Sequence, residues 1–288
     1  MTPLSLAALA TSTVFMYLLG ARLFASARFA VLTAALFALT PLLWRQSQGA
    51  PASLYPLPFV AGWLFAVAHF RSAHAAWWPV IAGALLGGGV YTSNAAAIMM
   101  PLYAILTIAV VAHARAVPLR ELALFVAAFS MAAAPLAVSF ISHPEAFRNT
   151  VNAYHLYDAN RFNVLQGMRE MSSWVGLTAR TEVYYDYFNP AFLFLTGRVL
   201  LFPLAVLIPT GLYQIVSDET TPLARLSMAG FLTAPFAASL TAEAPTPGRI
   251  LFITPFAAIV SVYGMNRLLS RGPSVSGGSW LWVRSRRS

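Results

Sequence analysis

One long polar segment decides how this chain is organised: residues 143–190, which read HPEAFRNTVNAYHLYDANRFNVLQGMREMSSWVGLTARTEVYYDYFNP. It holds five of the nine acidic residues, five of the eleven tyrosines and two of the five histidines. The sequence on either side is apolar enough to lie in a bilayer, so this segment is expected to form a loop outside the membrane. Such a loop holds a polar ligand and does chemistry there, or it forms an ordered cap over helix ends, and both interpretations remain open.

The composition predicts an integral membrane protein. The 288 residues are 59% hydrophobic and 9% charged, whereas soluble domains contain about 25% charged residues. The absence of cysteine excludes disulfides, thiolate nucleophiles and cysteine-ligated metals. All eighteen basic residues are arginine, which excludes a lysine Schiff base. The net charge of +9 does not indicate nucleic acid as a partner, because the arginines are scattered between apolar segments. This distribution is typical of arginines that set membrane topology or contact anionic lipids.

Nine apolar segments approach the length of about 20 residues that a helix needs to cross a bilayer. The expected fold is therefore an all-α integral membrane protein with about nine transmembrane helices and one ordered extracytoplasmic loop region. The expected helices are 3–22, 29–44, 53–70, 76–93, 95–113, 121–141, 191–216, 223–241 and 249–266. They form a single domain, residues 1–269, with its long outer loop at 142–190 and a basic cytoplasmic tail at 270–288.

The arginines predict the orientation of these helices. When residues 22–28 are placed in the cytoplasm, the arginines of the short loops gather on that side, as the positive-inside rule requires. The N-terminus and the long loop then lie outside, and the C-terminus lies in the cytoplasm. The arginines on the cytoplasmic side are Arg22, Arg28, Arg71, Arg115, Arg120, Arg225, Arg267, Arg271, Arg284, Arg286 and Arg287.

The long loop is expected to be ordered and to contain short helices. Its aromatic and apolar content is too high for a disordered segment. Leu165, Met168, Met171 and Val175 also follow one another at helical spacing. Within the bundle, Gly83 and Gly87 form a small-xxx-small pair that predicts close packing against a neighbouring helix.

Two arginines on the outer side require an explanation. Arg45 and Arg249 each lie beside an apolar helix, on the side that the positive-inside rule depletes of charge. A charge near membrane depth is costly and usually has a partner, and the planar guanidinium fork suits a phosphate. These arginines are thus candidates for binding a lipid phosphate. The alternatives are that they extend to ordinary lipid headgroups or that one of them pairs with Glu243.

Aromatic and carboxylate residues gather on the same side, as they do in carbohydrate sites. Rings cover the apolar faces of a sugar, amides and carboxylates bind its hydroxyls, and a carboxylate is able to act as general base. Taken singly, each aromatic also fits the interfacial belt of a membrane protein. The candidates for binding the sugar or the acceptor are Tyr55, Tyr91, Asn94, Tyr154, His155, Tyr157, Tyr184, Tyr185, Tyr187 and Asn189. The candidates for the catalytic base are Asp158, Glu182 and Asp186, among which spacing does not choose.

No metal site is predicted. His143 and His155 are too far apart for a helical i,i+4 pair, and there is no thiol. No cofactor is predicted either, although a divalent cation remains open.

A series of short motifs, in a constant order from residue 4 to about residue 269, resembles the GT-C glycosyltransferases. The similarity is greatest to bacterial members related to protein O-mannosyltransferases, aminoarabinose transferases and lipopolysaccharide-core transferases. The motifs are GARLF at 20–24, TP at 40–41, WRQS at 44–47, LYPLPF at 54–59, residues 87–94, MPLY at 100–103, HPEAF at 143–147, residues 184–194, RILF at 249–252 and PF at 255–256.

This resemblance implies a multi-pass enzyme of the inner (plasma) membrane that serves the cell envelope. The enzyme would transfer a sugar from a polyprenyl-phosphate carrier to a glycan, lipid or protein acceptor on the outer face. In that family a first helix and a first outer loop, which carries the acidic catalytic base, precede the stretch matched here. The resemblance therefore implies a truncated or catalytically incomplete form, or a partner chain that supplies the missing N-terminal part.

Two other classes of function remain open. One is a non-catalytic lipid-binding membrane subunit. The other is a transporter or flippase, which would need charged residues at the middle of its helices. The expected helices are almost free of such charges, and their polar residues gather on one face, which favours surface chemistry over translocation.

Overall fold

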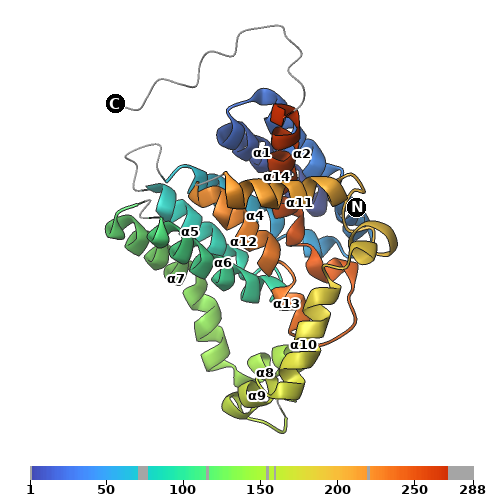
Figure 1. Ribbon diagram of the computed structural model, residues 1–288. Coiled ribbons are helices and arrows are strands. Elements are labelled where there is room, and N and C mark those ends of the chain that lie inside the picture. The colour runs from blue at the N-terminus through green and yellow to red at the C-terminus, as the bar shows by residue number, and fades with distance from the viewer. Residues whose placement is uncertain are drawn as a thin grey trace, which may run out of the picture.

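The computed structural model describes residues 2–70, 77–114, 117–153, 156–158, 160–218 and 221–271, and within these ranges the chain is helical, without strands (Figure 1). The elements are α1 (Pro3–Phe24), α2 (Ala27–Ala38), α3 (Pro41–Gly49), η1 (Pro51–Leu54), α4 (Leu57–Ala68), α5 (Trp77–Gly89), α6 (Asn94–His113), α7 (Leu119–Ser142), α8 (Pro144–Ala153), α9 (Val164–Met171), α10 (Trp174–Asp186), the π-turn η2 (Ala191–Thr196), α11 (Leu204–Ser217), α12 (Pro222–Thr233), α13 (Phe236–Ser239), η3 (Pro247–Ile250) and α14 (Ile253–Arg271).

Several of these helices have the length and apolarity of membrane spans. Four qualify among the described residues, namely α1, Pro51–Ala68, α6 and α7, and the bent pair α2 and α3 makes a fifth. Only 6% of the apolar window of α7 is buried inside the protein, so most of this helix is available to lipid. The prediction of an all-α protein with membrane character is therefore confirmed.

Three of the expected helices are interrupted, and two of the breaks have a local cause in a proline. The helix expected at 29–44 bends by 43° before Pro41, whose ring disfavours helical geometry in the residue before it; Thr40 accordingly has ψ of 121°. The segment 191–216 is not continuous, because η2 ends at Thr196 and the next helix, α11, begins at Leu204. Residues 223–241 divide into α12 and α13 at Pro235, which cannot donate a helical hydrogen bond.

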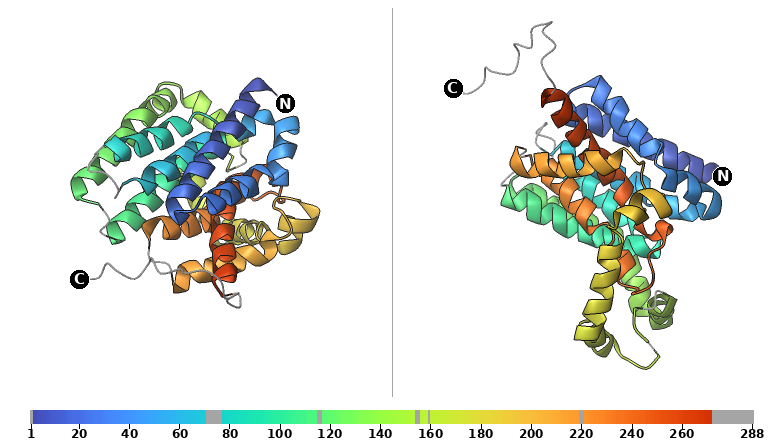
Figure 2. Two further views of the ribbon diagram at one scale, coloured as in Figure 1. Left: turned by 90° about the horizontal axis from the view of Figure 1, so that it is seen from above. Right: turned by 45° about the vertical axis from the view of Figure 1, so that its right-hand side comes forward.

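An aromatic cluster forms the centre of the bundle. The rings of Trp63 on α4 and Tyr103 on α6 are stacked with centroids 5.2 Å apart, and both side chains are fully buried. Phe256 on α14 lies edge-on to Tyr103 at 5.3 Å. Because α14 also packs against α2, α11 and α12, it joins the first and last parts of the bundle (Figure 2).

Glycines bring two pairs of helices into backbone contact. A Cβ added at Gly83 or Gly87 of α5 would overlap backbone atoms of α7, since for Gly87 the carbonyl oxygen of Phe129 would lie at 2.7 Å. The prediction of close packing at these two glycines is confirmed. An equivalent contact between α11 and α14 was not predicted from the sequence. Gly211 faces the carbonyl of Val260, and Gly264 faces the carbonyl of Leu207.

Between α7 and α11, residues 143–190 form a region that projects from the bundle and contains α8, α9 and α10 (Figures 1 and 2). The prediction of short helices in this loop is thus confirmed. The single apolar helical face expected from 165 to 175 is wrong, because α9 ends at Met171 and Val175 belongs to α10. Of the expected tail, Ser270 and Arg271 belong to α14, and residues 272–288 lie outside the described part of the chain.

Candidate functional site

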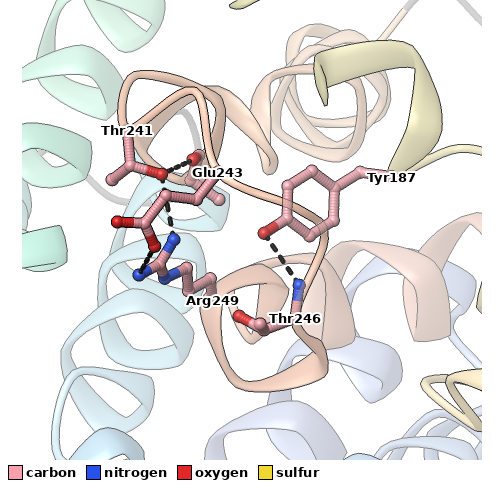
Figure 3. A network of polar contacts seen from close by, with 6 residues as sticks. Tyr187, Thr241, Glu243, Thr246 and Arg249 are labelled. Carbon is pink, nitrogen blue, oxygen red and sulfur yellow. Dashed lines mark hydrogen bonds and ion pairs between the residues drawn. The ribbon is translucent and has the colours of Figure 1, made fainter. Parts of the chain in front are cut away.

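Arg249 lies at the centre of a polar network just before α14 (Figure 3). Its Nη2 forms an ion pair with Oε2 of Glu243 at 2.5 Å, and its Nη1 donates a hydrogen bond to Oγ1 of Thr241 at 2.9 Å. The side chains of Arg249 and Glu243 remain 37% and 40% exposed. Pairing of Arg249 with Glu243, one of the alternatives drawn from the sequence, is confirmed.

The turn that carries Glu243 has an unusual backbone. Ala242 lies between Thr241 and Glu243 with φ of 52°, in the left-handed region that non-glycine residues seldom adopt. Arg198 has φ of 47°, directly after Gly197, whose carbonyl oxygen accepts a hydrogen bond of 2.7 Å from Nη1 of Arg45. Strained backbone of this kind tends to gather at functional sites.

Arg45 and Arg249 belong to adjacent segments at one end of the bundle. The amide of Gln46, the neighbour of Arg45, lies against Gly248, the neighbour of Arg249; a Cβ on Gly248 would be 2.8 Å from Nε2 of Gln46. Ser53 donates a hydrogen bond of 3.2 Å to Oε1 of Gln46. Arg45 itself is exposed, and its only interaction within the described residues is the one with Gly197.

Tyr187 connects the projecting region to this network (Figure 3). Its ring is fully buried and meets Phe192 edge-on at 5.6 Å. Its hydroxyl accepts a hydrogen bond of 3.3 Å from the backbone N–H of Thr246. Burial raises the pKa of the Tyr187 phenol above its ordinary value, and the hydrogen bond from Thr246 and the charge of Arg249 act in the opposite direction. Tyr187 therefore stays neutral and positions the turn that precedes Arg249.

Arg180 of α10 attaches the projecting region at a second point. Its guanidinium donates to three carbonyl oxygens, at 3.0 Å to Leu240, at 2.9 Å to Leu156 and at 2.9 Å to Gly176. Burial lowers the pKa of this guanidinium, and the charge of Glu170 opposes that shift. The side chain joins α10, the 156–158 segment and the end of α13.

Two of the tyrosines predicted to bind sugar form hydrogen bonds to backbone groups of other helices. The hydroxyl of Tyr91 donates to the carbonyl of Ala132 at 2.8 Å and accepts from the N–H of Leu136 at 3.2 Å, which places it in the α7 hydrogen-bond ladder beside Pro135. Tyr184 donates to the carbonyl of Leu232 at 2.6 Å. Burial raises the pKa of Tyr184, and Tyr185 adds a smaller shift in the same direction.

The remaining candidates are distributed over the same end of the bundle and the projection. Tyr55 is half-buried, Asn94 and Tyr185 are exposed, and the side chain of Asn189 accepts from the N–H of Ala191 at 2.9 Å. Tyr157 packs over Gly167 and lines a cavity of about 490 Å³. This cavity is bounded by Pro144, Arg148, Tyr157, Asn160, Arg161, Phe162, Asn163 and Val164. Tyr154 and His155 lie outside the described residues.

None of the three candidate bases joins the Arg249 network. Glu182 and Asp186 are exposed on α10. Asp158 pairs with Arg161 at 3.2 Å beside the distal cavity. The carboxylate that contacts Arg249 is Glu243, which was predicted from the sequence only as a pairing partner. Among the described residues, no group of three or more histidine, aspartate or glutamate side chains is arranged to hold a metal ion.

Comparison of the chain with protein-family models, with curated proteins and with solved structures finds no match. The resemblance to GT-C glycosyltransferases therefore stays a prediction carried by the motifs, and the residues that meet at the Arg249 network define the candidate site.

Proposed function

We propose that this protein is a membrane glycosyltransferase of the GT-C type, which transfers a sugar from a polyprenyl-phosphate donor to an acceptor at the outer membrane surface. The observation that carries the proposal is the contact between the segments of Arg45 and Arg249, which brings two guanidinium groups to one end of the bundle. The acceptor is a glycan, a lipid or a protein.

The two arginines would bind the phosphate that links the sugar to its carrier. Thr241 and Glu243 hold the Arg249 guanidinium in one orientation, and its partial exposure leaves it accessible. As the sugar departs, negative charge grows on the carrier phosphate, and positive groups fixed beside that phosphate stabilise the transition state. An incoming phosphate would compete with the Glu243 carboxylate for Arg249 and release that carboxylate near the reaction site.

The membrane arrangement that goes with this function has about nine crossings. We assign these crossings to α1, α2 with α3, η1 with α4, α5, α6, α7, α11, α12 with α13, and α14; among the described residues, four or five of these have the length and apolarity of a span by themselves. In the inner (plasma) membrane, the bundle end that holds Arg249 faces outward and the opposite end faces the cytoplasm, in line with the arginine distribution.

Reporter fusions at Val117 and Ser217 should give a cytoplasmic signal, and a fusion at Asn163 should give an external one. The reverse pattern would overturn the orientation.

A non-catalytic lipid-binding subunit is the second candidate function. It is favoured by the observation that Glu243, the carboxylate of the Arg249 network, is held in an ion pair with Arg249, while none of the candidate bases Asp158, Glu182 and Asp186 joins that network. Such a subunit would bind the lipid-linked sugar without turnover, and a partner chain would supply the base.

Arg249→Ala and Arg45→Ala are each expected to weaken binding of a polyprenyl-phosphate analogue to the detergent-solubilised protein by about tenfold to a hundredfold. Each variant removes a charge-assisted hydrogen bond to phosphate, which is worth roughly 1.5–3 kcal/mol. The measurement is a fluorescence titration, with thermal unfolding as the test of fold integrity. An assay of sugar release from the intact donor distinguishes the two proposed functions, because an enzyme releases sugar and a non-catalytic binding subunit does not.

Two further variants serve as controls. Arg120→Ala removes an exposed arginine at the opposite end of the bundle and should leave the affinity unchanged. Glu243→Gln weakens the ion pair but keeps Arg249, so affinity should be retained or should increase. Unchanged affinity in both arginine variants, with the fold intact, would rule out the phosphate role.

A further inference from the structure

A second cavity lies at the end of the bundle opposite to Arg249. It has a volume of about 250 Å³ and is formed where α1, α4 and α6 end and α12 begins. Arg22 lies near the end of α1, and the chain then crosses the bundle through α2 and α3 to reach Arg45. The cavity and the Arg249 network are therefore separated by the length of the bundle. The lining residues are Arg22, Leu23, Val67, Ala68, Phe70, Val111, Thr221, Pro222, Leu223 and Tyr263.

The polar part of this lining consists of Arg22, Thr221 and Tyr263, of which Arg22 carries a positive charge. Among the described residues that line the cavity, Arg22 is the only charged one. Its guanidinium is exposed and makes no hydrogen bond or ion pair within the described chain. The first turn of α12 begins beside it at Pro222, capped by the Thr221 side chain, and the N-terminal end of a helix carries partial positive charge. An anion at this position would interact favourably with both groups.

The rest of the lining is apolar. Leu23, Val67 and Phe70 come from the ends of α1 and α4, and Val111 and Leu223 come from α6 and α12. Both α1 and α6 have the length and apolarity of membrane spans, so their last residues lie at the level where headgroups meet acyl chains. A ligand that combines an anionic group with a hydrocarbon chain satisfies both parts of this lining.

We propose that this cavity binds an anionic phospholipid of the surrounding membrane, with the lipid phosphate on Arg22 and the start of an acyl chain against the apolar wall. Free inorganic phosphate would leave the apolar wall exposed to water. A zwitterionic lipid would bring its cationic group close to the Arg22 guanidinium, which carries the same sign of charge. The inference does not depend on the proposed transferase activity, because it concerns the opposite end of the molecule and a lipid that is not consumed.

The test compares lipids and variants on the full-length protein in detergent micelles. Native mass spectrometry is used to measure bound dioleoyl phosphatidylglycerol against dioleoyl phosphatidylcholine at equal concentrations. We expect wild type to retain the anionic lipid preferentially and Arg22→Ala to bind it about tenfold less tightly, because one charge-assisted contact is lost. The matched control is Arg28→Ala, an exposed arginine on the next helix that does not line the cavity, and it should behave as wild type.

A second variant tests the apolar wall separately. Ala68→Trp places a large ring in the cavity and should also lower retention of phosphatidylglycerol, with Arg22 still present. Equal retention of the two lipids by wild type, or an equal loss in Arg22→Ala and Arg28→Ala, would overturn the proposal. Displacement of the lipid by millimolar inorganic phosphate would also overturn it, since that result assigns the site to the free anion. Should Ala68→Trp fail to fold, the arginine comparison still decides the outcome.

Discussion

Replacement of Gly264 by valine is expected to prevent the bundle from assembling. Even a Cβ at this position would overlap the carbonyl oxygen of Leu207 on α11, and Gly211 has the same relation to Val260 on α14. Neither obstacle is the end of a flexible side chain, because both are backbone atoms in the middle of helices. The two helices would have to separate, which costs the buried contacts between them, so the free energy of unfolding should fall by about 4 kcal/mol or more. Monodispersity in size-exclusion chromatography and unfolding in mixed micelles measure the loss.

Gly88→Ala is the matched control for this prediction. Gly88 is also a helical glycine, but a Cβ there would lie 3.4 Å from the ring of Phe59, which is an ordinary contact. Alanine should be tolerated or should stabilise α5 by up to about 1 kcal/mol, because it has the higher helix propensity. If Gly264→Val and Gly88→Ala were equally stable, the close approach of α11 and α14 would be wrong.

Replacement of Arg180 by methionine is expected to detach the projecting region from the bundle while the bundle stays folded. Methionine retains much of the apolar stem but loses all three hydrogen bonds, leaving the carbonyls of Leu156 and Leu240 without this donor. Because the guanidinium is only partly buried and water replaces some of the bonds, we expect a local loss of about 2–3 kcal/mol. Hydrogen exchange measured by mass spectrometry should become faster in α10 and residues 156–158, with α6 and α14 unchanged.

Arg169→Met provides the comparison for Arg180, since Arg169 is exposed on α9 and makes no hydrogen bond within the described chain. It changes the net charge by the same amount and should leave exchange in α10 unaltered. Uniform acceleration across the whole protein in Arg180→Met would contradict a local attachment and indicate a global role.

Much of the fold could be predicted because long apolar runs allow only helices in lipid. Segments such as 95–113 and 121–141 agree with α6 and α7 to within two residues. The errors occur where an apolar run contains a backbone break that hydropathy does not register. Pro41 and Pro235 indicated two of these breaks, but the apolarity of the surrounding residues outweighed them in the prediction. The end of η2, by contrast, depends on the carbonyl oxygen of Leu193, which accepts hydrogen bonds from the N–H groups of both Val199 and Leu200. That arrangement requires tertiary packing.

The site could be predicted only in part. Topology alone placed Arg45 and Arg249 at one end, and short spacing made Glu243 a partner for Arg249. Composition could not distinguish a tyrosine that binds a ligand from one that binds the backbone. Tyr91 illustrates this, because its partners on α7 are more than 40 positions away in sequence. The cavity lined by Arg22 was missed for the same reason, since its walls come from five helices that are far apart in the sequence.

The central position of α14 has a consequence for biosynthesis. This helix is made after every other described helix, yet its residues Phe256, Ile259 and Val260 are fully buried against partners made much earlier. Until Ile253 and its successors leave the ribosome, the surfaces of α2, α4 and α11 that receive them stay uncovered in the membrane. Nascent chains that stop before α14 therefore expose the surfaces that α14 covers, including Gly211 of α11, to lipid and to the quality-control machinery. Assembly of the bundle is thus a late event, which follows insertion of the individual helices.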